Sequence, residues 1–264
     1  MTEIERSFGR HAFGDDPANY DAVRPSYPDW VFDMLGSTCG LEPGSAVFEI
    51  GAGTGTATRR VLRMGAAPLI AIEPDRRLAG FLRHTYPSPN LQILIEPFET
   101  AELSERAFDL GLAATAFHWL HEAVALAKIA RLLKPRGWWA ALWNVFGDNS
   151  RRDPFHEATK GLLSDSKSPS AGTGGVPFAL DTTARIAALH RAEAFEGIEH
   201  HVSRWELVLT AEQTVALYAT YSDVAARPDR AQVLGELRRI AENDFAGRVT
   251  RNMSTSLLLA RRRS

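Results

Sequence analysis

The chain has 264 residues, of which 45% are hydrophobic and 23% charged, and its formal net charge at pH 7 is -2. This composition is that of a globular protein with an ample core, and the balanced charge provides no basic field for binding nucleic acid. The single cysteine, Cys39, excludes an internal disulfide and is too few for a cysteine-based zinc site. No apolar run is long enough to span a membrane and the polar N-terminus has no signal-peptide core, so we expect a cytoplasmic protein without membrane contact.

Residues 1–35 are expected to form an N-terminal cap. Within them, residues 24–28 read Arg-Pro-Ser-Tyr-Pro, and the two prolines restrict this segment to an extended or turning path. The segment is either a surface arm held by its aromatic side chains or a flap over a bound cofactor. In the second case, Arg24 or Tyr27 would face the ligand.

Residues 47–58 predict a strand, a glycine turn and the start of a helix. The strand Val47–Ile50 is apolar enough to be buried on both faces of a sheet. Glycines at alternate positions follow it, namely Gly51, Gly53 and Gly55. Because glycine adopts positive φ and has no Cβ, the backbone here can turn sharply and lie against a ligand. One of the threonines in residues 54–58 is available to cap the helix, whose first N–H groups would point at that ligand.

An acidic residue follows the next predicted strand. Residues 69–72 are apolar, and Glu73 stands at their C-terminal end, about 20 positions after the glycine turn. An acid in that position accepts hydrogen bonds from the two hydroxyls of a ribose. The glycine spacing fits an NAD-dependent oxidoreductase less well, because the third glycine comes two residues after the second and not three. That enzyme class is kept as an alternative.

Two segments of this region resemble a known family. Phe-Glu-Ile-Gly-Ala-Gly-Thr-Gly at residues 48–55 resembles motif I of the class I S-adenosylmethionine-dependent methyltransferases. Ala-Ile-Glu-Pro-Asp at residues 71–75 resembles the acidic strand end that follows it. Arg-Pro-x-Tyr-Pro at residues 24–28 and Phe-His-Trp at residues 117–119 are similar to a small-molecule branch near trans-aconitate methyltransferases. A protein that binds S-adenosylmethionine without turnover is a further alternative.

The resemblance implies S-adenosylmethionine as cofactor, S-adenosylhomocysteine as product, and methyl transfer to an oxygen, nitrogen or carbon of a small molecule. The backbone of the glycine turn would lie against the methionine portion, and Glu73 would bind the ribose. Phe98 and Glu99, after a predicted strand at residues 91–95, would flank the adenine, unless Glu99 is only an acid at a helix N-terminus. The residues implied in cofactor binding are Arg24, Tyr27, Glu49, Gly51, Ala52, Gly53, Thr54, Gly55, Glu73, Pro74, Phe98, Glu99 and Thr115.

His118 follows a predicted strand at residues 108–116, at the sheet edge where ligands bind in doubly wound folds. It is either a general base or a packing residue. Methyl transfer from a sulfonium mostly needs alignment of the reacting atoms, so the choice stays open. The histidine pairs at residues 118 and 121 and at residues 200 and 201 have no acidic or thiol partners at metal-site spacing, so no metal is expected.

The remaining elements complete one α/β domain over residues 1–264. With these elements, the resemblance implies a doubly wound, Rossmann-like, seven-stranded sheet with its last strand antiparallel, in an α/β/α sandwich. Residues 147–185 are rich in turn-forming residues and are expected to be a substrate lid. The other expected elements are a helix at 122–133, a turn at 134–137, strands at 138–145, 200–209 and 253–260, and helices at 211–225 and 230–246.

Overall fold

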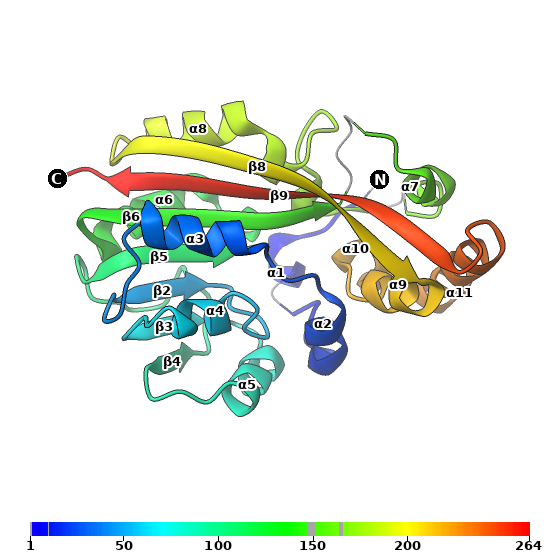
Figure 1. Ribbon diagram of the computed structural model, residues 1–264, viewed down its shortest axis with the longest axis horizontal. Helices are drawn as coiled ribbons and strands as arrows, with labels where there is room; N and C mark the ends of the chain where they lie inside the picture. Colours follow the sequence, from blue (N-terminus) through cyan, green and yellow to red (C-terminus); the bar gives the residue numbers. More distant parts are fainter. Residues whose placement is uncertain (1, 10, 147–150, 164–165) are drawn as a thin grey trace.

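A seven-stranded sheet runs through the computed structural model, which describes residues 2–9, 11–146, 151–163 and 166–264 (Figure 1). The strands nearest the glycine turn are parallel, whereas β9 is antiparallel to both of its neighbours. The predicted fold class is therefore confirmed. In spatial order the strands are β4 (Leu91–Leu94), β3 (Leu69–Ile72), β2 (Val47–Ile50), β5 (Phe108–Ala114), β6 (Leu133–Phe146), β9 (Arg248–Arg262) and β8 (Phe195–Thr210).

Helices cover both faces of this sheet, because alternate residues of each strand point to opposite sides. One face packs against α3 (Asp29–Ser37), α4 (Thr58–Arg63) and α5 (Arg76–Thr85). The other packs against α6 (Glu122–Leu132) and α8 (Thr182–Arg191). In β2, Val47 joins the first core and Phe48 the second, which explains why the strand is apolar on both faces.

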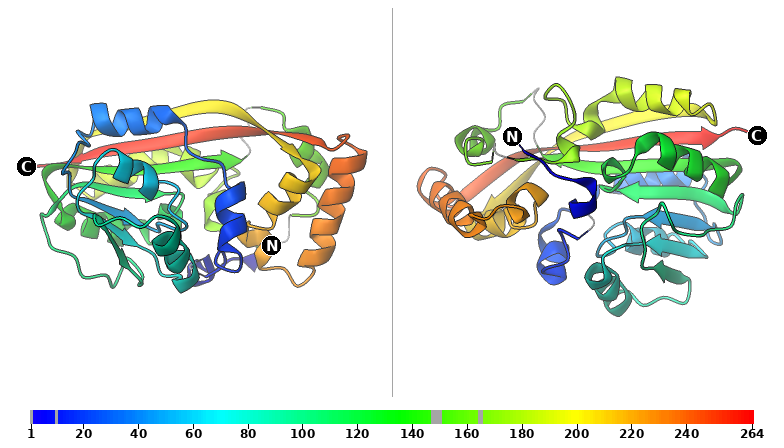
Figure 2. Two further views of the ribbon diagram at one scale, coloured as in Figure 1. Left: turned by 60° about the horizontal axis from the view of Figure 1, so that its bottom comes forward. Right: turned by 180° about the vertical axis from the view of Figure 1, so that it is seen from behind.

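Strands β6, β8 and β9 have 14, 16 and 15 residues, against four in β2, and they extend past the carboxyl edge of the short strands. At their far end lies a separate apolar cluster of helices (Figure 2). A buried ion pair between Arg251 and Asp153, 2.9 Å, fixes α7 (Pro154–Thr159) to β9. The other helices of this cluster are α9 (Ala211–Tyr218), α10 (Ser222–Ala225) and α11 (Arg230–Asn243).

The N-terminal segment contains β1 (Thr2–Glu3), α1 (Arg6–Gly9) and α2 (Pro17–Val23). β1 pairs with β7 (Ser166–Lys167), so the start of the chain meets the insertion after β6. That insertion also holds the short helices η2 (Pro169–Ala171) and η3 (Phe178–Leu180), while its residues 147–150 and 164–165 lie outside the described ranges. Among the described residues, no helix is long and apolar enough to cross a membrane.

Two local predictions were wrong. The turn expected at residues 134–137 is a bulge within β6: Phe108 pairs with Leu133 and Leu110 with Trp138, so four residues are looped out while Arg136 adopts φ 65°. No threonine caps α4, because its N-cap is Ala57, without a side-chain hydrogen bond. Thr58 is instead the first helical residue, and its hydroxyl donates to Glu49.

Candidate active site

A groove follows the carboxyl ends of β2, β3 and β5, where ligands bind in doubly wound sheets. It has two lobes, which we call the Glu49 lobe and the Glu73 lobe after the acid that lines each. The two lobes share a wall, which we call the junction. The junction consists of Tyr20, Gly51, Gly53, Ala114 and Thr115.

The glycine turn between the lobes requires residues without a side chain. Gly51, Gly53 and Gly55 have φ of 67°, 58° and 97°, in the left-handed region that side chains disfavour. A Cβ on Gly51 would lie 2.5 Å from the Cβ of Ala116, and one on Gly55 would lie 2.4 Å from Leu82. The turn can therefore adopt this path only because these positions are glycine, and it brings the backbone of Gly51 and Gly53 to the wall of both lobes, whereas Gly55 lines neither.

Glu73 follows β3 and is only 4% exposed. Its Oε2 accepts a hydrogen bond from the Gly53 amide (2.8 Å), and its Oε1 accepts one from the Asp75 amide (2.9 Å). Burial raises the pKa of this carboxyl to about 7, against the lowering effect of the two amides. The acid is thus fixed at the wall of its lobe, among apolar residues such as Ile72 and Leu78.

Glu49 lies at the other side of the glycine turn and is 1% exposed. Its Oε2 accepts from Thr58 Oγ1 (2.6 Å), but its Oε1 has no hydrogen-bond partner among the described residues. Thr54 Oγ1, also buried, has no such partner in the described part of the chain either. Burial raises the pKa of Glu49 to about 8, and the nearby charge of Glu73 adds to that rise. A buried, unpaired carboxyl oxygen beside a cavity is suited to a cationic ligand group.

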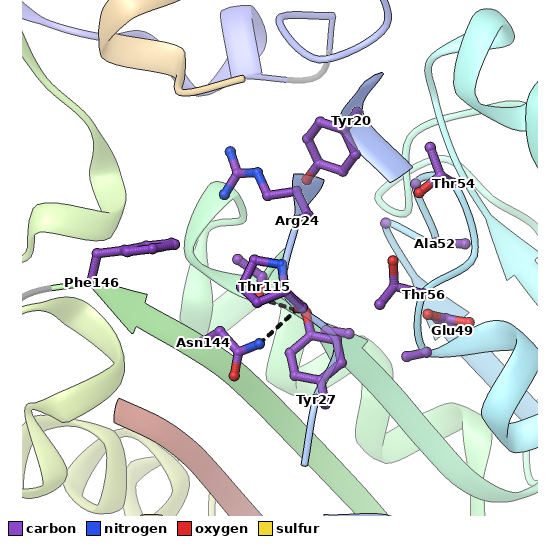
Figure 3. Close-up of a pocket in the computed structure, with 15 residues that line it drawn as sticks. Tyr20, Arg24, Tyr27, Glu49, Ala52, Thr54, Thr56, Thr115, Asn144 and Phe146 are labelled. Atoms are coloured by element: carbon purple, nitrogen blue, oxygen red, sulfur yellow. Dashed lines mark hydrogen bonds between the residues drawn. The ribbon is translucent and has the colours of Figure 1, made fainter. Parts of the chain in front are cut away.

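Arg24 reaches the Glu49 lobe from the end of α2. Its guanidinium lies 5.0 Å from the ring centroids of both Tyr20 and Tyr221, and Nη2 donates to the Thr220 carbonyl oxygen at 2.7 Å. Figure 3 shows Arg24 between Tyr20 and Phe146, across the lobe from Glu49. The lobe thus has a cationic group on one side and an acidic group on the other.

Tyr27 and Thr115 meet at the junction. Their hydroxyl oxygens are 2.7 Å apart (Figure 3), and burial of Tyr27 raises the pKa of its hydroxyl far above the usual value. Thr115 has φ 55°, which is a strained conformation for a β-branched residue. Asn144 Nδ2 donates to the carbonyl oxygens of Pro25 and Ser26 and so holds the segment that carries Tyr27.

Phe98 and Glu99, which the resemblance assigned to the adenine, both line the Glu73 lobe. Phe98 is 3% exposed and stacks on Phe48, with ring planes inclined by 8° and centroids 6.2 Å apart. Lys128 on α6 holds the loop from behind, since its Nζ donates to the carbonyl oxygens of Phe98 (2.6 Å), Glu99 (3.2 Å) and Ala101 (2.6 Å). The apolar, flat wall that results is suited to an aromatic base.

His118 lies in the short helix η1 (Phe117–Trp119) and is 3% exposed. Its Nδ1 accepts a hydrogen bond from the indole of Trp143 at 3.2 Å, so the neutral ring carries its proton on Nε2. Burial lowers the pKa of the ring to about 3, with further lowering by Arg6 and Arg24. His118 lines neither lobe, whereas Trp119 and Leu120 line the Glu73 lobe. This geometry favours the packing alternative over the general base.

Several lining residues were not predicted from the sequence. Tyr20, Asn144 and Phe146 line the Glu49 lobe, and Phe13 lines the Glu73 lobe. The only sequence signal for Phe13 and Tyr20 was that they are large aromatics in an otherwise polar segment. Among the described residues, no three His, Cys, Asp or Glu side chains gather as a metal site would require.

Comparisons with known proteins point to a methyltransferase. Residues 48–141 match the family model of a methyltransferase domain. An uncharacterised methyltransferase-like protein of Schizosaccharomyces pombe is 26% identical over 232 residues, which are 87% of this chain and 86% of that protein. An uncharacterised methyltransferase of Mycobacterium bovis is 28% identical over 233 residues, or 87% of this chain and 85% of that protein.

Among solved structures, phosphoethanolamine N-methyltransferase 2 of Haemonchus contortus, bound to phosphomonomethylethanolamine and S-adenosylhomocysteine, has the same fold. Its TM-score is 0.60 at 11% identity, and the match covers 95% of this chain and 58% of that one. The two relatives and the family model are described as methyltransferases, which favours S-adenosylmethionine over the NAD alternative. The protein is an S-adenosylmethionine-dependent methyltransferase, and S-adenosylmethionine is its cofactor.

Proposed function

We propose that this enzyme transfers the methyl group of S-adenosylmethionine to an oxygen, nitrogen or carbon atom of a small molecule, and that the two-lobed groove is its active site. The observation that carries the assignment is the unpaired Oε1 of Glu49, an acid that lines one lobe while Glu73 lines the other. The cofactor has an ammonium group at one end and a ribose and base at the other. The two acids match those two ends.

The Glu73 lobe takes the adenosine half. Glu73 accepts hydrogen bonds from the ribose hydroxyls, with the lone pairs that the Gly53 and Asp75 amides leave available. Phe98, Glu99 and Pro74 frame the adenine, on the apolar wall that Lys128 fixes from behind.

The Glu49 lobe takes the methionine half. Glu49 Oε1 accepts from the ammonium, and the unpaired Thr54 hydroxyl and the Arg24 guanidinium donate to the carboxylate. The glycine turn, with Ala52, supplies the backbone against which this half lies: Gly51, Ala52 and Gly53 line the lobe, and Gly55 completes the turn behind them. Arg24 and Tyr27 thus belong to a flap, in accord with the N-terminal cap proposed for residues 1–35.

The acceptor is a small molecule, and the enzyme belongs to a small-molecule branch near the trans-aconitate methyltransferases. The protein works in the cytoplasm without nucleic acid or membrane partners. Support for a small acceptor is the position of the groove, which the N-terminal segment covers through Gly9, Phe13 and Tyr20. Residues 147–185, whose β7 pairs with β1, serve as the substrate lid. His118 is a buried packing residue that accepts a hydrogen bond from Trp143, and it does not act as a base. Catalysis comes from alignment of the acceptor and the methyl group in a site shielded from water.

Calorimetric titration of the purified protein with S-adenosylhomocysteine, with NADH run in parallel, tests the site. We expect saturable binding of S-adenosylhomocysteine alone. Binding of NADH alone would contradict the proposal and assign Glu73 to a dehydrogenase. Incubation with methyl-labelled S-adenosylmethionine and a panel of small acids, phenols and amines then tests turnover. Cofactor binding without label transfer to any of them would favour a binding protein.

A further inference from the structure

The junction is the narrow wall that both lobes share. If the proposed function is right, the two halves of the cofactor occupy the two lobes, and the positively charged sulfur that links them lies at this wall. Among the five junction residues, Tyr20 and Thr115 alone have polar side chains. Thr115 Oγ1 is hydrogen-bonded to the hydroxyl of Tyr27, so two hydroxyl oxygens lie at the proposed position of the sulfur.

Thr115 is held in a costly conformation. It directly follows β5 with φ 55°, and a β-branched residue in the left-handed region is strained. Its amide donates to the Leu142 carbonyl oxygen at 2.7 Å, which fixes the strained backbone to β6. Glycine would adopt this φ without strain. The presence of a hydroxyl-bearing residue at such a position indicates that the hydroxyl has a role.

Tyr27 is fixed from the opposite side of the groove. It is 8% exposed, and the two preceding carbonyl groups, of Pro25 and Ser26, accept hydrogen bonds from Asn144 Nδ2 at 3.0 and 3.2 Å. The hydrogen bond between Tyr27 and Thr115 uses one of the two hydroxyl protons and one oxygen lone pair. Lone pairs of both oxygens are therefore left to interact with a ligand.

We propose that the Tyr27–Thr115 hydroxyl pair recognises the sulfonium of S-adenosylmethionine and distinguishes it from the neutral thioether of S-adenosylhomocysteine. The partial negative charge on the two oxygens attracts the positive sulfur and its polarised methyl group, whereas the thioether of the product carries no such charge. The pair thereby favours the substrate form of the cofactor over the product form. Because both oxygens are fixed, they also restrict the direction of the methyl group toward the acceptor.

The test measures the dissociation constants of S-adenosylmethionine and S-adenosylhomocysteine for the wild type, Tyr27→Phe and Thr115→Val. Each substitution removes one hydroxyl and keeps the shape of the side chain. We expect the constant for S-adenosylmethionine to rise about 5-fold in each variant, and that for S-adenosylhomocysteine to change less than about 2-fold. The double variant should lose little more than either single one, because the two hydroxyls act as a pair.

Two further variants serve as controls. Thr115→Ser keeps the hydroxyl, so it should retain the wild-type ratio of the two constants. Thr54→Val removes a hydroxyl from the methionine end of the groove, and it should weaken both ligands equally. Thermal denaturation confirms that each variant is folded; if Thr115→Val is not, Tyr27→Phe carries the test.

An unchanged ratio in Tyr27→Phe would overturn the inference, whether both constants rise together or neither moves. Equal losses would make the pair a general cofactor contact, and no loss would make it structural. If the wild type bound neither ligand, the proposed function itself would be contradicted. If the wild type bound both ligands and Tyr27→Phe kept the same ratio, the inference alone would fail.

Discussion

The two lobes of the groove are built on neighbouring strand ends, yet their polar groups are satisfied to different degrees. In the Glu73 lobe both carboxyl oxygens accept backbone hydrogen bonds, and the surrounding wall is largely apolar. In the Glu49 lobe one carboxyl oxygen and the Thr54 hydroxyl are buried without partners in the described chain. A satisfied lobe selects a ligand by shape, whereas an unsatisfied one gains most from a ligand that supplies the missing charges.

The two lobes also differ in the free-energy cost of ionising their buried acid. Each acid has a pKa raised by burial, to about 7 for Glu73 and about 8 for Glu49. An acid whose folded pKa lies above its unfolded value destabilises the empty protein once it ionises. Glu49 has the higher pKa and an oxygen without a partner in the described chain, so its lobe stores unfavourable energy that a cation can relieve, and it should contribute most to the dependence of binding on pH near pH 8.

The largest effect is expected from Glu73→Ala. The variant removes the acceptor for the ribose hydroxyls and also the partner of the Gly53 amide, which shapes the glycine turn. We expect the affinity for S-adenosylhomocysteine, measured by calorimetry, to fall by on the order of 1–3 kcal/mol. If a folded Glu73→Ala protein bound the product as the wild type does, Glu73 would have no place in the site.

Glu49→Gln should weaken binding through charge alone, because the amide keeps the size of the side chain. At pH 8 we expect the dissociation constant of S-adenosylhomocysteine to rise ~10-fold, the loss of one charge-assisted hydrogen bond to the ammonium. The wild type itself should lose affinity as the pH falls from 8 to 6, because Glu49, with a pKa of about 8, then binds a proton that the ligand must displace. The two proteins should therefore converge at pH 6. A constant gap between them over this range would assign the pH dependence to another group.

The same substitution should stabilise the empty protein. The folded pKa of Glu49, about 8, lies above its ordinary value of 4.5, so its ionisation disfavours the folded state at high pH and the penalty is absent below pH 4.5. We expect Glu49→Gln to raise the free energy of unfolding at pH 8.5 by ~1–3 kcal/mol, and the gain to shrink toward pH 5. Urea denaturation without ligand measures this. A variant less stable than the wild type at pH 8.5 would show that the Thr58 hydrogen bond outweighs burial.

The parts of the molecule that the sequence predicts are those set by local patterns. Strand β2, its glycine turn and Glu73 lie within 27 residues. The continuous apolar run of the strand and the need for glycine at positive φ can both be recognised within that short segment. The features that distinguish the lobes depend on distant pairings. Asn144 is hydrogen-bonded to Pro25, which is 119 residues away in the sequence, and Tyr27 to Thr115, which is 88 residues away. No local sequence pattern predicts either contact. The left-handed conformation of Thr115 was equally hidden, because threonine at a strand end predicts extended backbone.

The smallest effect concerns Lys128, which supports the Glu73 lobe without lining it. Its ammonium donates to the three carbonyl groups of the loop that presents Phe98 and Glu99, and it lies 4.9 Å from the centroid of the Phe98 ring. Lys128→Met keeps the aliphatic stem but frees the loop, so we expect ~2- to 5-fold weaker binding of S-adenosylhomocysteine. Free adenosine should weaken by the same factor, because the loss falls on the adenine wall alone.

Lys134→Met is the matched control, since Lys134 pairs with Asp109 at 2.8 Å, lines neither lobe and should leave both affinities unchanged. A loss for S-adenosylhomocysteine without one for adenosine would mean that Lys128 acts on the whole groove. The contrast between a lobe that selects by shape and one that selects by charge would then not hold at this wall.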